Sequence, residues 1–160
     1  IYQLNKKRKG LMTSKPVTIL LAEDDPEDRY LIGEALTECR ISHDLRLVEN
    51  GEEMLDYLYR RGAYAGEEDF PLPGLILLDL NMPLMDGREV LEVIKADAKL
   101  KRIPVVVFTN SKSDEDILRS YDLGVSGYIT KPVSYLGLLN SINAIGMYWL
   151  QIASLPPQEY

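Results

Sequence analysis

The sequence predicts an α/β fold in which one parallel sheet is covered by helices on both faces. Residues 75–78 (LILL) form a short, wholly apolar run between Gly74 and Pro83, which is typical of a strand buried on both faces. Four similar runs occur along the chain, and each run is followed by a segment with apolar residues at helical spacing. This alternation, with short links, is the signature of a parallel sheet.

The five expected strands are short, and the helices between them have recognisable start signals. Asp25 suits an N-cap and Pro26 the first helical position; Asn50-Gly51, Asp86-Gly87 and Asp114 mark later helix starts. A last helix runs from about 134 to about 152. The expected strands cover 17–22, 45–48, 75–78, 103–108 and about 128–130.

Each helix should bury one apolar stripe. The expected buried positions are Ile32, Ala35, Leu36 and Cys39 in the first helix; Met54, Leu55 and Leu58 in the second; Val90, Leu91, Ile94 and Ala98 in the third; Ile117, Leu118 and Tyr121 in the fourth. Residues 62–73 are expected to form a solvated loop, and His43 a surface position between a helix and a strand.

Right-handed crossovers leave few possible strand orders. A common one is the flavodoxin-like (βα)5 doubly wound parallel sheet with order 2-1-3-4-5. We expect one such domain over residues 16–153, a disordered or vector-derived N-terminal tail over 1–15 with Met12 as the natural start, and a C-terminal tail over 154–160.

Composition excludes several classes of function. The net charge of −7 argues against non-specific nucleic-acid binding. The single cysteine, Cys39, excludes an intrachain disulfide, and the single histidine leaves no His/Cys cluster for zinc. The chain has no run of about 18 apolar residues and no visible signal peptide, so we expect a cytoplasmic protein that does not insert into membranes.

Polar side chains follow four of the five strands. Asp24 and Asp25 follow the first, Asp79 the third, Thr109 the fourth and Lys131 the fifth. All carboxyl ends of a parallel sheet lie at one edge, where ligands bind. Crowded carboxylates repel one another unless a positive charge lies between them, so we expect Lys131, a divalent cation such as Mg²⁺, or both at this edge.

A carboxylate beside a divalent cation, a lysine and a threonine suits phosphoryl transfer. A carboxylate is a known nucleophile toward phosphorus and gives an aspartyl phosphate. The cation and the ammonium group would neutralise the phosphoryl oxygens in flight. An acyl phosphate is readily hydrolysed, so the product suits a switch.

These segments together resemble the receiver domain of two-component response regulators. The resemblance rests on Asp24-Asp25, on LLDLNMP with Asp86-Gly87, on VFT ending at Thr109 and on YITKP at 128–132. It implies that Asp79 is the phospho-acceptor and that Asp25, Asp79 and the Asn81 carbonyl hold Mg²⁺ with help from Asp24; Mn²⁺ or Ca²⁺ can take its place. It also implies that Lys131 pairs with the phosphate, that Thr109 and Tyr128 form a switch pair, and that the Lys131–Pro132 bond is cis.

A resemblance to one group within this family indicates the kind of kinase that acts on the protein. YRRGAY, ILRSYDLG and the apolar C-terminal helix are similar to the stand-alone regulators paired with cyanobacterial phytochrome-type kinases. This implies a non-enzymatic response regulator that receives phosphate from a sensor histidine kinase. The alternative is a phosphorelay intermediate that passes the phosphate to a histidine phosphotransfer protein.

The C-terminal helix carries two apolar stripes, and no charged residue occurs between Pro132 and Gln158. We expect one stripe, with Leu136, Leu139, Met147 and Leu150, to face the sheet. The second stripe should face a partner, most simply a second copy of the chain, unless the C-terminal tail folds back over it. That second stripe comprises Tyr135, Leu138, Ile142, Ile145, Trp149 and Ile152.

Two other functions remain open at this point. A flavin-binding protein of this fold needs a Ser/Thr/Gly-rich first turn for the phosphate, whereas Glu23-Asp24-Asp25-Pro26 would repel it. A structural partner with a dead site is disfavoured by the complete set of Asp24, Asp25, Asp79, Thr109 and Lys131.

Overall fold

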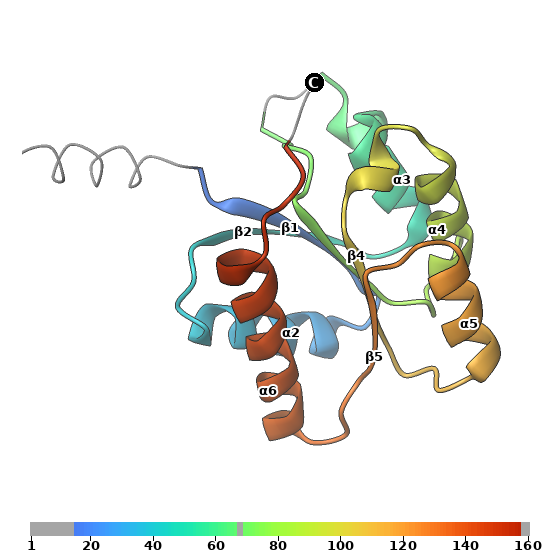
Figure 1. Cartoon of the computed structure of the whole chain (residues 1–160). Helices are drawn as coiled ribbons and strands as arrows, with labels where there is room; N and C mark the ends of the chain where they lie inside the picture. The colour runs from blue at the N-terminus through green and yellow to red at the C-terminus, as the bar shows by residue number, and fades with distance from the viewer. Residues whose placement is uncertain (1–14, 67–68, 158–160) are drawn as a thin grey trace, which may run out of the picture.

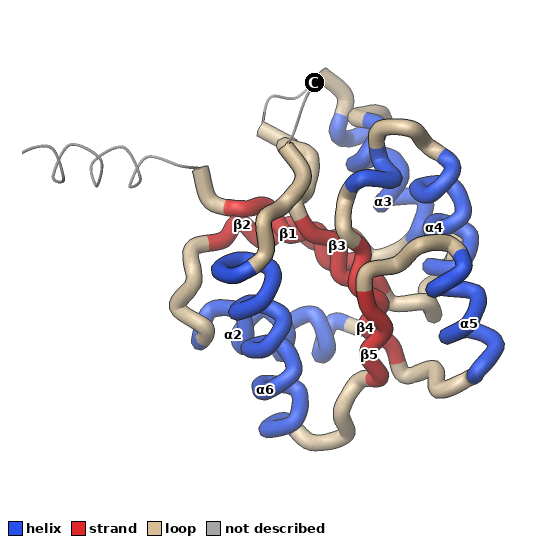
Figure 2. The backbone as a smooth tube through the Cα atoms, viewed as in Figure 1, coloured by secondary structure: helices blue, strands red, loops and turns tan. Residues whose placement is uncertain are grey.

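Five parallel strands form one sheet in the order β2-β1-β3-β4-β5 (Figure 2). The computed structural model describes residues 15–66 and 69–157. The predicted fold class and strand order are confirmed, and β3 lies at the centre of the sheet. The strands are β1 (Val17–Ala22), β2 (His43–Val48), β3 (Leu75–Leu78), β4 (Val105–Thr109) and β5 (Gly127–Thr130).

Helices cover both faces of this sheet (Figure 1). One layer contains α2 (Pro26–Glu38) and α6 (Tyr135–Gly146). The other contains α3 (Gly51–Tyr59), α4 (Gly87–Ala96) and α5 (Asp114–Asp122). Alternate side chains of the strands point into two separate hydrophobic clusters, one under each helical layer.

Side-chain caps define where the helices begin. Asp25 and Asn50 cap α2 and α3, and Asp86 forms a capping box with Glu89 at the start of α4. The prediction that Asp114 caps α5 is wrong by one residue. Ser113 is the cap, because its hydroxyl accepts the Asp116 N–H, and Asp114 lies in the first turn.

Two predictions at element ends also need correction. His43 is the first residue of β2, paired with Val17, rather than part of a loop. Ala98 is exposed because α4 ends at Ala96, and the short 3₁₀ helix η2 (Leu100–Arg102) buries Leu100 in its place.

The predicted buried face of α5 is largely wrong. Leu118 and Tyr121 are 64% and 51% exposed, whereas Ser120 is buried and Ile117 is half-buried. The helix is rotated about its axis relative to the prediction. In this orientation Asp116 faces α4, where it forms an ion pair with Arg88.

The burial of the C-terminal helix follows neither predicted stripe completely. Leu138, Ile142 and Ile145 are buried against the sheet and α2, and Trp149 packs partly against the same cluster. They are therefore core residues and do not form a free interface. Of the stripe predicted to face the sheet, Leu139 and Leu150 pack partly against the same cluster, whereas Leu136 and Met147 are exposed. Tyr135 and Ile152 of the predicted interface stripe are exposed. Both stripes are apolar enough to be buried, and packing against α2 decides between them.

The end of the chain crosses the amino-terminal edge of the sheet. The helix continues past α6 as a π-helical segment, η3 (Met147–Ile152). Beyond it, Leu155 packs so closely on Gly74 that a side chain at Gly74 would crowd Leu155 and Val17. The tail therefore closes the bottom of the sheet and does not cover a helix stripe.

The predicted solvated loop 62–73 is described over residues 62–66 and 69–73, and side chains from both parts pack against the first hydrophobic cluster. A single 3₁₀ turn, η1 (Gly62–Tyr64), brings the Tyr64 ring against Tyr57 and Phe70 at centroid distances of 5.2 and 4.9 Å. The Tyr57 hydroxyl donates to the Pro71 carbonyl at 2.8 Å. These contacts hold the segment against α3 and lead the chain into β3.

Among the described residues, none of the helices has the length and apolar character needed to cross a bilayer. Cys39 is half-buried at the end of α2, where it packs against the second hydrophobic cluster as predicted.

Candidate functional site

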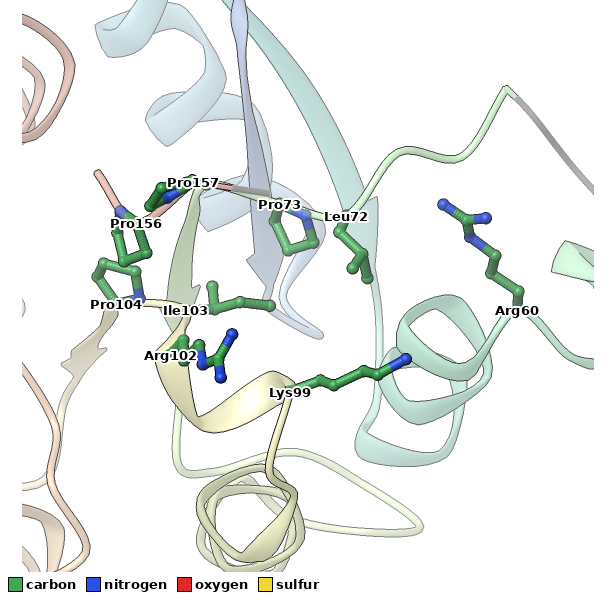
Figure 3. A pocket seen from close by; sticks show the side chains of 10 residues that line it. Arg60, Leu72, Pro73, Lys99, Arg102, Ile103, Pro104, Pro156 and Pro157 are labelled. Carbon is green, nitrogen blue, oxygen red and sulfur yellow. The ribbon is translucent and has the colours of Figure 1, made fainter. Parts of the chain in front are cut away.

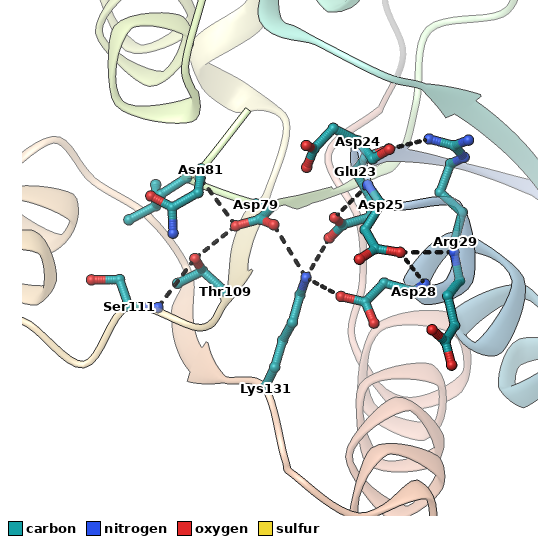
Figure 4. Close-up of polar contacts among 12 residues, drawn as sticks. Glu23, Asp24, Asp25, Asp28, Arg29, Asp79, Asn81, Thr109, Ser111 and Lys131 are labelled. Carbon is teal, nitrogen blue, oxygen red and sulfur yellow. Dashed lines mark hydrogen bonds and ion pairs between the residues drawn. The ribbon is translucent and has the colours of Figure 1, made fainter. Parts of the chain in front are cut away.

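Asp79 lies immediately after the central strand and is 5% exposed. Its Oδ1 accepts hydrogen bonds from the Thr109 hydroxyl at 2.7 Å and from the Asn81 N–H at 3.1 Å. Its Oδ2 accepts from the Lys131 ammonium group at 3.1 Å (Figure 4). The structure therefore brings together Asp79, Thr109 and Lys131, which the sequence places at the ends of three different strands.

The backbone around Asp79 is held from two sides. Its N–H donates to the Ala22 carbonyl at 3.0 Å, so that β1 and β3 end level with each other. The start of α4 approaches from below, where the Gly87 N–H donates to Leu80 at 2.9 Å. A Cβ at Gly87 would overlap the Asp79 carbonyl oxygen. Glycine is therefore required for this close approach.

Lys131 is the buried cation of the site. Its ammonium group contacts Glu23 at 2.5 Å, Asp28 at 2.7 Å and Asp79 at 3.1 Å, and its side chain is 6% exposed. Burial alone would lower the pKa of Lys131. The hydrogen bonds to Asp28 and Glu23 and the charge of Asp79 outweigh burial and raise that pKa. Lys131 therefore stays charged.

The peptide bond that follows this lysine is trans, so the expected cis bond is wrong. The trans isomer is the one that X–Pro bonds prefer, by about 0.5–1 kcal/mol. The Lys131 N–H donates to the Thr109 carbonyl at 2.8 Å, which carries the chain past β4 and aims the side chain at Asp79.

Glu23 is a site residue that the sequence analysis missed. It is 1% exposed, accepts from Lys131, and accepts the Asp25 N–H at 3.1 Å. Burial, reinforced by the charge of Asp79, raises the pKa of Glu23 to about 8 against the opposing effect of Lys131. The signal was available: the apolar run of β1 stops at Ala22, so Glu23 is the first side chain at the strand end.

Three carboxylates form a group that could hold a metal ion. One oxygen each from Glu23, Asp24 and Asp79 lies within 4.8 Å of the others. Oxygen-only ligands suit Mg²⁺ or Mn²⁺. Asp24 and Asp79 are in the predicted ligand set, and Asn81 lies beside it through its N–H bond to Asp79.

Asp25 is not part of this group. Its carboxylate accepts the N–H groups of Glu27 and Asp28 and caps α2, so the predicted acidic pair is shifted by one residue. The capping geometry turns the Asp25 side chain along the helix. It also places Asp28, one turn on, next to Lys131.

A second polar network extends from Thr109 to α5. The Ser111 N–H contacts the Thr109 hydroxyl oxygen at 3.4 Å, and the Ser111 carbonyl accepts the Tyr128 hydroxyl at 2.9 Å. The Ser111 hydroxyl donates to Asp116 at 2.6 Å. The predicted switch pair, Thr109 and Tyr128, is therefore connected through one residue.

Arg88 closes this network on the other side. It forms a bidentate pair with Asp116 at 2.6 and 2.5 Å, and this hydrogen bonding lowers the pKa of Asp116 to about 2. Its remaining N–H groups approach the Leu80 carbonyl at 3.4 Å and the Asn81 amide oxygen at 3.5 Å. The segment after β3 is thereby tied to the segment after β4.

Comparison with known proteins places this geometry among signalling domains. A model of the response regulator receiver domain matches residues 19–143. Response regulator Rcp1 of Synechocystis sp. PCC 6803 is 42% identical over 144 residues, covering 90% of this chain and 96% of Rcp1. The methanogenesis regulatory protein FilR2 of Methanothrix harundinacea, named as probable, is 39% identical over 88% of each chain.

Solved structures of such regulators superpose closely. The phosphorylated cyanobacterial phytochrome response regulator RcpA has a TM-score of 0.83 at 45% identity, covering 89% of this chain and 99% of RcpA. The Mn²⁺-bound form of Rcp1 has the same TM-score at 42% identity, covering 89% of this chain and all of Rcp1.

Proposed function

Since this chain belongs to the response regulator receiver domain family, we propose that it is a phosphorylation switch whose acceptor is Asp79. The observation that carries the proposal is the environment of this carboxylate. It is buried, yet it contacts a hydroxyl donor and an ammonium group and shares a metal-sized cluster with Glu23 and Asp24. The hydroxyl and the ammonium group that a phosphoryl group would contact, and the carboxylates that would hold a metal ion, therefore already surround Asp79.

In the transfer, an Asp79 carboxylate oxygen attacks phosphorus and the bond from phosphorus to the donor nitrogen or oxygen breaks. In the resting state both donors hold the carboxylate itself: Thr109 holds Oδ1 and Lys131 holds Oδ2. Forming the acyl phosphate removes the negative charge of that carboxylate and places charge on the phosphoryl oxygens. The same two donors then turn to those oxygens.

Glu23, Asp24 and Asp79 would hold Mg²⁺, with Mn²⁺ able to replace it, and the Asn81 carbonyl is the further ligand that the family resemblance implies. When bound, the cation supplies positive charge that offsets the phosphoryl oxygens in the transition state. Lys131 supplies the protein's own charge at the same place. Its contact with Asp28 on α2 orients the ammonium group while it exchanges partners.

Ser111 couples the two residues of the proposed switch, because its N–H contacts the Thr109 hydroxyl and its carbonyl accepts the Tyr128 hydroxyl. When the Thr109 hydroxyl leaves Asp79 for the phosphoryl group, the weak contact from the Ser111 N–H is disturbed. The Tyr128 hydroxyl is held only by the Ser111 carbonyl among the described residues. Tyr128 is then free to turn inward into the space that Thr109 vacates, which changes the surface around β5 and the loop that leads into α5.

The test is phosphorylation with acetyl phosphate and Mg²⁺, followed by intact-mass measurement. We expect one hydroxylamine-labile phosphoryl group on the wild type and none on Asp79→Asn. Asp122→Asn, an exposed carboxylate of α5, is the matched control and should be labelled like the wild type. Equal labelling of Asp79→Asn would refute the assignment.

We propose a sensor histidine kinase of the phytochrome type as the phosphate donor. Similarity to Rcp1 and to the phytochrome response regulator RcpA supports this choice. Phosphotransfer from a phytochrome-type kinase should be at least tenfold faster than from an unrelated histidine kinase at equal concentration. Loss of phosphate to a histidine phosphotransfer protein, faster than hydrolysis, would favour the phosphorelay alternative.

We also propose that the regulator forms a homodimer, through a surface that includes Tyr135 and Ile152 of the expected stripe but not its buried members. The exposed large apolar side chains from Val133 to the end of the described chain are Val133, Tyr135, Leu136, Met147, Tyr148 and Ile152. Light scattering with and without beryllofluoride measures the oligomeric state and the effect of phosphorylation on it. Ile152→Ser should yield monomers; if Leu118→Ser on α5 does so instead, the α5 face forms the dimer.

A further inference from the structure

A cavity of about 260 Å³ opens at the amino-terminal edge of the sheet, at the opposite end from Asp79. Its walls come from four separate parts of the chain (Figure 3). These are the end of α3 at Arg60, the segment 72–74 before β3, the η2 region through Pro104, and the tail at Pro156 and Pro157. Pro156 and Pro157 of the tail complete the wall of this cavity at the amino-terminal edge of the sheet.

Among residues 15–66 and 69–157, three cations and no acidic residue line this cavity. They are Arg60, Lys99 and Arg102. Within residues 15–66 and 69–157, none of these three side chains makes a hydrogen bond or an ion pair. Three unpaired cations around one cavity are unexpected in a chain with a net charge of −7, and they leave a local excess of positive charge.

The carboxylates closest in sequence are engaged elsewhere. Asp97 accepts the N–H groups of Lys99 and Leu100 at 2.8 and 2.9 Å and the Tyr59 hydroxyl at 3.0 Å. Asp56 pairs with Arg61 at 2.8 Å. Neither carboxylate forms an ion pair with Arg60, Lys99 or Arg102 within the described residues, so the three cations have room for an anionic ligand.

The rest of the wall is apolar and rigid. Pro73, Pro104, Pro156 and Pro157 surround the cavity together with Leu72 and Ile103. Proline rings lose little conformational entropy when a ligand packs on them. A bare inorganic anion would satisfy the cations and leave these walls in water, whereas an organic anion with a flat apolar body covers both.

We propose that this cavity binds a small organic dianion, with an aromatic or aliphatic body of about a dozen heavy atoms. The body lies against the prolines. Figure 3 shows the Lys99 side chain extending toward the side of the cavity where Arg60 lies, whereas Arg102 lies beside Ile103. One anionic group would therefore face Lys99 and Arg60, and the other would face Arg102. The site is separate from the phospho-acceptor and does not depend on the proposed function.

Terephthalate is a suitable probe, because terephthalamide has the same size and shape without the charge. Isothermal titration in low-salt, metal-free buffer should give a dissociation constant near about 1 mM or tighter for the dianion, and at least about tenfold weaker binding for the diamide. Raising the salt concentration should weaken the dianion only. Amide shifts in NMR spectra should concentrate at residues 99–104.

Charge-removing variants locate the site. Lys99→Gln combined with Arg102→Gln should weaken binding at least about tenfold, with an unchanged urea midpoint because both side chains are exposed. Lys112→Gln is the matched control, since Lys112 is an exposed cation in the loop after β4, at the opposite edge. Equal binding by the diamide, or full binding by the double variant, would overturn the proposal.

A final comparison separates a small-molecule site from a seat for the chain's own end. Glu159 follows the two prolines closely and is itself an anion. A chain ending at Pro157 should bind terephthalate as the full chain does. If removal of residues 158–160 increases affinity tenfold or more, the tail is a competing occupant and the assignment to a free organic dianion is wrong.

Discussion

The two ends of the sheet hold positive charge in opposite ways. At the carboxyl end, one lysine is buried and contacts three carboxylates at 2.5–3.1 Å. At the amino end, Arg60, Lys99 and Arg102 are exposed around a cavity and make no ion pair within the described part of the chain. The charge of Lys131 is thus fully paired until a metal ion or a phosphoryl group changes its partners, whereas the three cations at the amino end are accessible to a ligand.

The parallel topology explains this polarity. Each helix that follows a strand starts at the carboxyl edge and ends at the amino edge. Helix N-termini favour anions and helix C-termini favour cations. The acidic cluster therefore lies near the starts of α2 and α4, and Arg60 and Lys99 follow the ends of α3 and α4. The helix dipoles alone do not account for the buried cluster. Its charged groups are removed from water, so each one needs an opposite charge beside it to remain stable.

The largest effect should come from breaking the buried cluster. Lys131→Met leaves the buried carboxylate of Asp79, and above about pH 8 that of Glu23 as well, without its cation, and we expect a loss of about 3–5 kcal/mol in the free energy of unfolding. Urea denaturation in metal-free buffer measures it. Saturating Mg²⁺ should recover part of the loss. Lys99→Met at the open end should change stability by less than about 0.5 kcal/mol; similar losses for the two variants would contradict the comparison.

Adding a side chain at Gly87, where the backbone of α4 packs closely against Asp79, should have the next largest effect on stability. Gly87→Ala places a Cβ against the Asp79 carbonyl, and the resulting shift of α4 should cost about 1–3 kcal/mol. Phosphorylation by acetyl phosphate should slow in parallel. Gly33→Ala is the control: its Cβ would meet only Leu45, at 3.6 Å. Since alanine favours helix, that variant should be neutral or up to about 1 kcal/mol more stable.

The raised pKa of Glu23 predicts a pH dependence of metal binding. Because burial raises the pKa of Glu23 to about 8, we expect this group to carry a proton at pH 6–7 in the metal-free protein, which a metal ion must displace. Mn²⁺ affinity should therefore rise between about pH 6 and pH 8, by up to roughly tenfold per unit, and level off above. Titration calorimetry or Mn²⁺ paramagnetic resonance measures this slope. Glu23→Gln should bind more weakly with little slope; a wild type without the slope would contradict the prediction.

The raised pKa of Glu23 also makes the free energy of unfolding depend on pH, in the opposite direction to metal affinity. A folded-state pKa above the ordinary value of 4.5 means that the folded protein binds more protons than the unfolded chain. Metal-free stability should therefore fall as pH rises from about 4.5 to about 8. Added Mg²⁺ should reduce this fall, because the cation stabilises the charged carboxylate.

The smallest effect concerns two ion pairs between the same helices. Arg88 and Asp116 are mostly buried and bidentate, so a double-mutant cycle should give a coupling of about 1 kcal/mol at pH 7. It should disappear as pH falls through the Asp116 pKa of about 2. Arg119 and Glu92 form a neighbouring pair that is about half exposed. No measurable coupling is expected there, and an equal value would show that burial does not set the difference.

The sequence alone determined the architecture and most of the site around Asp79. A wholly apolar run of four residues between turn signals, such as 75–78, is typical of a buried strand, and parallel strands bring their carboxyl ends to one edge. The position of Asp79 beside Thr109 and Lys131 follows from that rule and from the strand order. It needs no knowledge of side-chain packing.

The tertiary structure decided three other features, because each is a competition between equivalent local choices. Two carboxylates could enter the site after β1, and the exact strand end selects Glu23 while the helix cap takes Asp25. Two stripes of α6 could face inward, and packing against α2 selects the one with Ile142. The cavity at the amino end exists only because the tail at Pro156 returns across the sheet. Local periodicity shows which residues are apolar or charged, whereas only contacts between distant segments determine which of them are buried together.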